Sequence, residues 1–78
     1  MMETIIPIYS TNPQPLKKGE VVYTTSALFK FDNRKRLFDT EVKLVGEATC
    51  KHIETYKDPS PTGNTNYTYG KWQILEVI

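Results

Sequence analysis

Apolar and polar residues alternate along the stretch from Gly19 to Phe31. A strand shows this period of two when one of its faces is packed and the other is wet. The stretch therefore predicts one long β-strand. Its packed face would hold Val21, Tyr23, Thr25, Ala27, Phe29 and Phe31.

A second alternating stretch runs from Glu41 to Cys50. Val45 is out of phase in it, and Gly46 is the expected site of a β-bulge. A helix over 41–56 is the alternative, because Val42, Val45, Thr49, Ile53 and Tyr56 also share one helical face. The β-branched residues and the central glycine favour the strand. Its packed row would be Val42, Leu44, Ala48 and Cys50.

The remaining segments are consistent with short strands and turns. Pro7 has no amide hydrogen, so the stretch 4–9 suits an edge strand. The segments 16–20 and 32–35 are predicted to be turns, the second followed by a return strand that begins at Arg36. The segment 58–64 is the clearest loop. The last strand is expected over 65–78, with a bulge at Gly70 where its phase changes.

A chain of 78 residues is long enough for one small domain, here 1–78, with one core. The predicted class is all-β. The expected architecture is an antiparallel meander of about five strands, closed as a small SH3-like barrel or split into a small sandwich. If 41–56 were helical, the fold would instead be α+β.

Composition narrows the range of partners. Ten Lys and Arg nearly balance nine Asp and Glu, so no overall field attracts the chain to nucleic acid or to an anionic membrane. No signal peptide or membrane-spanning apolar run is visible, which predicts a cytosolic protein. Cys50 and His52 are the one cysteine and the one histidine, so neither a disulfide nor a usual zinc site is expected, and no cofactor is predicted. Small domains without such supports often gain stability by association.

The sequence contains few candidate catalytic residues. Cys50 and His52 lie two residues apart, on one face of a strand, where a thiol and an imidazole can pair. Free cysteine is nevertheless among the most buried residue types, which favours a packing role for Cys50. No glycine-rich phosphate loop is present. The sequence therefore predicts a protein that is not an enzyme.

Two clusters are candidates for binding. The basic cluster, at a predicted hairpin tip, is suited to phosphate or to an acidic partner. It consists of Arg34, Lys35 and Arg36. The aromatic cluster has the residue types that anchor protein interfaces and stack on bases. It consists of Tyr56, Tyr67, Tyr69 and Trp72, with Lys71 beside them.

The near-neutral charge favours a protein over a nucleic acid as partner. We expect a non-enzymatic binding protein that acts through a protein–protein interface. Its size suits an accessory or inhibitory protein of the phage or mobile-element type. The alternatives are a small nucleic-acid-binding β-barrel and a β protein that sequesters a small ligand through its tyrosines. Self-association into a homo-oligomer is a further option, and no membrane role is expected.

Overall fold

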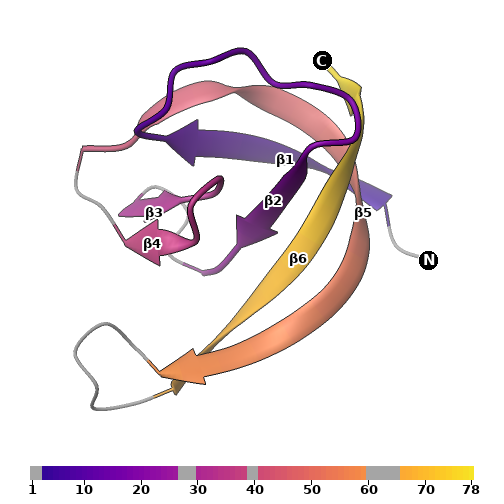
Figure 1. Cartoon of the computed structure of the whole chain (residues 1–78). Helices are drawn as coiled ribbons and strands as arrows, with labels where there is room; N and C mark the ends of the chain where they lie inside the picture. Colours follow the sequence, from indigo (N-terminus) through magenta and orange to yellow (C-terminus); the bar gives the residue numbers. More distant parts are fainter. Residues whose placement is uncertain (1–2, 27–29, 39–40, 60–65) are drawn as a thin grey trace.

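The computed structural model describes residues 3–26, 30–38, 41–59 and 66–78 (Figure 1). These residues form six strands and no helix, so the predicted all-β class is confirmed and the helix over 41–56 is wrong. The strands are β1 (Glu3–Ser10), β2 (Val21–Thr24), β3 (Phe31–Asp32), β4 (Leu37–Phe38), β5 (Lys43–Pro59) and β6 (Asn66–Val77). No helix among the described residues is long and apolar enough to cross a membrane.

Four strands form one antiparallel sheet in the order β1-β5-β6-β2, and β3 and β4 form a separate hairpin. The sheet curls into a half-barrel because β5 and β6 bend together along their length, and the hairpin lies on its inner side (Figure 1). This order is not a simple meander, since β1 pairs with β5 rather than with β2.

The single strand predicted from Gly19 to Phe31 is wrong. Strand β2 ends at Thr24, and the next strand begins at Phe31. Tyr23 donates its amide hydrogen to the carbonyl of Asn33, so the chain must leave the sheet after β2 and return beside it. Of the predicted packed face, Ala27 and Phe29 lie outside the described residues.

Three residues have no partner in the strand registers and mark bulges. Val45 is extra in β5 opposite β1, Ile53 is extra in β5 opposite β6, and Leu75 is extra in β6. The bulge expected at Gly46 is therefore one residue earlier, and none occurs at Gly70. Bulges bend a strand and increase its twist, which accounts for the curl of β5 and β6.

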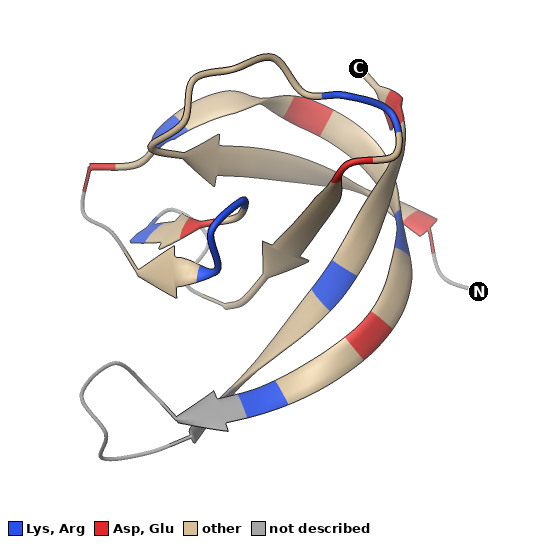
Figure 2. Cartoon of the chain, in the orientation of Figure 1, with Lys and Arg blue, Asp and Glu red and all other residues tan. Residues whose placement is uncertain are grey.

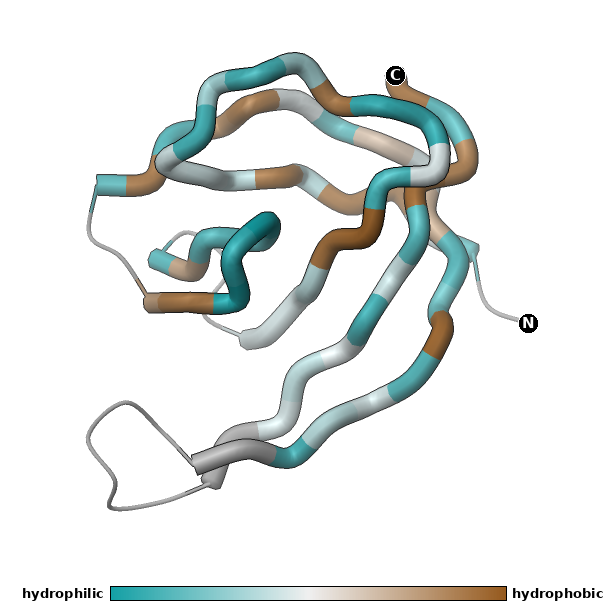
Figure 3. Tube along the Cα trace, viewed as in Figure 1, coloured by the Kyte–Doolittle hydropathy of each residue, from teal (hydrophilic) through white to brown (hydrophobic). Residues whose placement is uncertain are grey.

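The main core joins all four strands of the sheet and the segment before β2. Its buried members are Ile6, Ile8, Leu16, Val22, Ala48, Cys50 and Ile74. Val45 packs against this core, whereas Leu44 is 55% exposed, because the bulge reverses the predicted phase at these two positions. Figure 3 shows β2 hydrophobic where it begins and paler toward its end, and β6 hydrophobic near the C-terminus.

One residue closes the gap between the two edge strands. Asn33 donates its amide hydrogen to the carbonyl of Tyr9 in β1, and its own carbonyl accepts from Tyr23 in β2. Its side chain repeats both links: Oδ1 accepts from the Tyr9 amide, and Nδ2 donates to the Tyr23 carbonyl. Asn33 thus takes the place of a strand between β1 and β2.

Strand β1 is the edge strand that Pro7 predicted. The amide and carbonyl of Tyr9 point away from β5, toward Asn33. Successive residues of a strand point their backbone groups in opposite directions. Pro7, two residues earlier, therefore has its nitrogen on the same outer edge, where the missing hydrogen removes no bond to β5.

Candidate binding surface at the β3–β4 hairpin

Asp32 holds the turn of the β3–β4 hairpin in place. Its buried carboxylate accepts hydrogen bonds from the Ser10 and Thr11 hydroxyls and from the amides of Thr11, Arg34 and Lys35, at 2.8–3.0 Å. Burial raises the pKa of Asp32, but the hydrogen bonds from Thr11, Arg34 and Lys35 lower it by more. The net pKa lies below the ordinary value of 3.8. The turn is thereby fixed to the end of β1.

Arg34 is also part of this scaffold. Its guanidinium donates to the Glu20 carboxylate at 2.7 and 3.3 Å and to the carbonyls of Asn12 and Pro15 at 2.7 and 2.9 Å. Only 7% of its side chain is exposed. Of the predicted basic cluster, Arg34 therefore ties the turn to the segment before β2, while Lys35 is exposed.

Arg36 brings the basic and the aromatic clusters together. Its guanidinium carbon lies 5.1 Å from the ring centre of Tyr69, 5.6 Å from that of Tyr23 and 5.7 Å from that of Tyr56. These distances are typical of cation–π interactions. The Arg36 backbone has a φ of 62°, in the left-handed region that a non-glycine residue seldom adopts.

The three tyrosine rings pack against one another beneath Arg36. Tyr56 on β5 stacks on Tyr69, its direct partner on β6, with ring centres 5.2 Å apart. Tyr23 and Phe31 also contact Tyr69, at 6.1 and 6.5 Å. Tyr69 is 1% exposed and forms the centre of this aromatic cluster, whereas Tyr23 and Tyr56 are half-buried.

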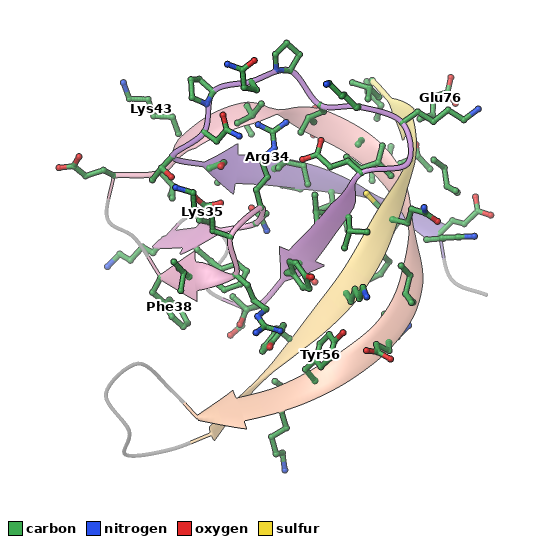
Figure 4. All side chains as sticks on the ribbon, viewed as in Figure 1. Arg34, Lys35, Phe38, Lys43, Tyr56 and Glu76 are labelled. Atoms are coloured by element: carbon green, nitrogen blue, oxygen red, sulfur yellow. The ribbon has the colours of Figure 1, made fainter. Side chains whose placement is uncertain are left out.

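Tyr56 lies at the margin of the cluster (Figure 4). A hydrogen bond with Glu54 raises the pKa of its phenol, and desolvation and the negative charge of Glu54 act in the same direction. Arg36 opposes them. The hydroxyl is therefore a neutral donor to the Glu54 carboxylate at physiological pH.

Strand β4 carries two large apolar side chains, which point to opposite faces of the hairpin because they are successive strand residues. Phe38 lies on the same face as its partner Phe31, and Leu37 on the face of its partner Asp32. Leu37 is 58% exposed and Phe38 is 38% exposed, although the Phe38 ring packs edge-on against Phe31 at 5.5 Å. We define the hairpin surface as the exposed and half-buried side chains on both faces of the hairpin and against it, namely Tyr23, Arg36, Leu37, Phe38 and Tyr56. Cationic residues of the turn, β5 and β6 lie around it (Figure 2).

The other predicted aromatic and basic residues have different surroundings. Trp72 packs against the main core, its Nε1 donates to the Thr24 hydroxyl at 2.8 Å, and its ring meets that of His52 edge-on. A Cβ at Gly70 would lie 2.6 Å from Trp72 Nε1, so the glycine makes room for this ring. Lys71 is half-buried opposite Tyr23 and Glu54. The side chain of Tyr67 lies outside the described residues.

Cys50 and His52 have separate partners. Cys50 is fully buried in the main core, its thiol lies 3.7 Å from the Ala48 carbonyl, and burial raises its pKa. His52 Nε2 is 3.0 Å from the Thr55 hydroxyl. A raised pKa keeps the thiol protonated and weakens it as a nucleophile. Among the described residues, no three potential metal ligands come together.

Two cavities lie away from the tyrosines. One of about 390 Å³ is bordered by Ser10, Thr11, Leu44 and Val45 among others. Another, of about 310 Å³, lies beside Pro15 and Arg34. Neither is lined by an aromatic side chain. Comparison with known proteins adds no relative, because no family model, curated protein or solved structure matches the chain.

Sequence reasoning missed Tyr23, Leu37 and Phe38 as members of this surface. Leu37 and Phe38 directly follow the basic turn. Two apolar residues at the end of a predicted hairpin are a sequence signal for an exposed binding surface. The alternation places Tyr23 on a packed strand face, whereas its contact with Arg36 depends on a cross-strand register that alternation does not specify.

Proposed function

We propose that this chain is a non-enzymatic binding protein whose hairpin surface contacts another protein. The observation that carries the proposal is a short hairpin that exposes a large apolar side chain on each face, Leu37 on one and Phe38 on the other, and that follows an arginine held over three tyrosine rings. Aromatic residues and arginine are enriched in the energetically dominant centres of protein interfaces. An accessory or inhibitory role would suit so small a binding surface.

The contacts of the basic residues support a protein partner over a nucleic acid. Arg34 is occupied by Glu20 and two carbonyls, and Arg36 lies over the tyrosine rings. A run of phosphates needs several cations presented together. A small-ligand role has less support, since Tyr23 and Tyr56 pack on the Tyr69 ring and neither of the two cavities described above is lined by a tyrosine.

The test begins with tagged wild-type chain, which is used to recover and identify a partner protein from cells that produce the chain. Binding of that purified partner is then compared among wild type, Leu37→Ser and the control Leu44→Ser, whose leucine is equally exposed outside the hairpin surface. We expect Leu37→Ser to weaken binding about 30-fold, as for an interface anchor, and Leu44→Ser to leave it unchanged. Equal affinities for all three would contradict the proposal, as would tight, salt-dependent binding of DNA or RNA in place of a protein.

A further inference from the structure

The two outer strands of the sheet have guarded edges. Asn33 takes up the outward amide and carbonyl of Tyr9 on β1 and of Tyr23 on β2. Pro7 has no hydrogen to offer on the outer edge of β1. Native sheets use such devices to prevent other chains from pairing with an edge.

Strand β5 has another edge, on which Thr55 and Lys57 are not covered in this way, although the strand ends at a proline, Pro59. Its pairing with β1 ends at Lys51, opposite Glu3, while its pairing with β6 continues to Pro59. Beyond Glu54, β6 is the one strand neighbour of β5 among the described residues, and Figure 1 shows the lower part of β5 with β6 on one side only.

The direction of the backbone groups on this edge follows from β6. The amide and carbonyl of Ile74 bond to Glu20 and Gly19, away from β5. Alternation along β6 then turns the backbone groups of Lys71 and Tyr69 toward β5. Their partners are Glu54 and Tyr56. The amides and carbonyls of the intervening Thr55 and of Lys57 therefore point outward.

The side chains at this edge leave room for an incoming strand. Thr55 and Lys57 are exposed, and neither position is a proline. Tyr56, between them, belongs to the hairpin surface, so the edge and that surface are continuous. A segment that pairs with Thr55 and Lys57 would reach Tyr56 without leaving the strand.

We propose that an extended segment of the partner protein adds to the sheet as a strand, antiparallel to β5 and opposite Thr55 and Lys57. This inference rests on the proposed function and specifies how the partner binds. The ammonium group of Lys57 favours a carboxylate on the incoming residue beside it, and the ring of Tyr56 favours an apolar neighbour. Main-chain bonds supply affinity in this mode, and alternate side chains supply specificity.

An extended segment suits this edge better than a second copy of the chain. The outward groups of Thr55 and Lys57 allow pairing over about five residues. The area that so short a pairing buries is well below the roughly 1,200 Å² of a stable interface between folded domains. A flexible segment can also follow the hairpin surface next to Tyr56, which adds contacts beyond the pairing at the edge.

The test compares Lys57→Pro with Lys57→Ala, using the partner protein recovered with the wild-type chain. Proline removes the outward amide hydrogen but no bond to β6, as Pro7 does on β1, whereas alanine removes only the charge. We expect Lys57→Pro to bind about tenfold more weakly than Lys57→Ala. In the wild-type complex, the Thr55 and Lys57 amides should exchange hydrogen more slowly than in the isolated chain, while those of Tyr56 and Tyr69, already bonded within the sheet, should change little.

Each outcome separates the two proposals. If Lys57→Pro and Lys57→Ala bind equally and the two amides stay fast in the complex, strand addition is overturned, while a defect in Leu37→Ser still supports the hairpin surface. A wild-type dimer that Lys57→Pro converts to a monomer would identify a second copy as the occupant and also overturn the inference. If Lys57→Pro does not fold, amide exchange in the wild-type complex decides. If the wild-type chain recovers no protein, both proposals fail.

Discussion

Asn33 and Tyr9 exchange hydrogen bonds as two paired strand residues do. The Tyr9 amide donates to Asn33 Oδ1 at 2.7 Å, and the Tyr9 carbonyl accepts from the Asn33 amide at 2.8 Å. One acceptor of this pair is a side-chain atom, Oδ1 of Asn33. The link therefore depends on the amino-acid type at position 33, whereas an ordinary strand pair uses backbone atoms alone.

Replacing Asn33 is expected to open this link. Asn33→Ala leaves the Tyr9 amide and the Tyr23 carbonyl without their side-chain partners, which should lower the free energy of unfolding by about 3 kcal/mol. Urea unfolding measures the change. Asn12→Ala is the matched control, because its exposed side chain accepts one bond from the Gln14 amide, and it should cost about 0.5 kcal/mol or less. Equal losses in the two variants would contradict the role given to Asn33.

Asp32 should make the free energy of unfolding decrease as the pH falls into the acid range. Its pKa is lower in the folded chain than the ordinary 3.8, so its stabilising effect is complete above that value and is lost as the pH falls through the folded pKa. Urea unfolding between neutral pH and the acid limit should show a steeper loss for wild type than for Asp32→Asn. Parallel curves for the two proteins would show that another group is responsible.

Two substitutions of Arg36 should distinguish its effect on backbone strain from its effect on partner binding. Arg36→Gly relieves about 1 kcal/mol of left-handed strain and loses a cation–π contribution of similar size, so its net stability should be close to that of wild type. Arg36→Ala keeps the strain and should be about 1 kcal/mol less stable than Arg36→Gly. Both variants should lose affinity for the partner protein. A folded Arg36→Gly that binds normally would remove the guanidinium from the proposed interface.

Cys50 should behave as a core residue. Cys50→Ala is expected to cost about 1 kcal/mol or more in unfolding free energy, because it leaves space among buried apolar side chains, and to leave partner binding unchanged. A thiol reagent should label the folded wild-type chain slowly and the unfolded chain quickly. Fast labelling of the folded chain would instead indicate an accessible, reactive thiol.

Local patterns in the sequence predicted the class and several boundaries of this fold. Alternation gave β5 its strand character, Pro7 marked an edge, and the Asp32 turn separates β3 from β4. The pairing of β1 with β5 is not local, and nothing in either stretch encodes the partner. The prediction that the strand from Gly19 continues through Phe31 is wrong. The alternation of residues extends beyond Thr24, but Asn33 bonds to Tyr9 and Tyr23 and so places the chain around Phe31 outside the main sheet.

The candidate surface was predicted less completely than the fold. The sequence singled out Arg36 and Tyr56 in separate clusters, and their contact depends on the curl of the sheet, which the bulges at Val45, Ile53 and Leu75 produce. Residue type alone marks Tyr69 and Arg34 as candidates for binding. Burial of Tyr69 and the ion pair of Arg34 with Glu20 are consequences of packing between distant segments.

The strand order β1-β5-β6-β2 has a kinetic consequence. Strands β5 and β6 are consecutive in the chain, so the loop between them costs little entropy to close, whereas β1 and β2 must each find a partner far along the sequence. We expect the β5–β6 hairpin to assemble first and to serve as the template on which β1 and β2 add. Asn33 can join these two strands only after both have arrived, so its replacement should speed unfolding and leave the folding rate nearly unchanged.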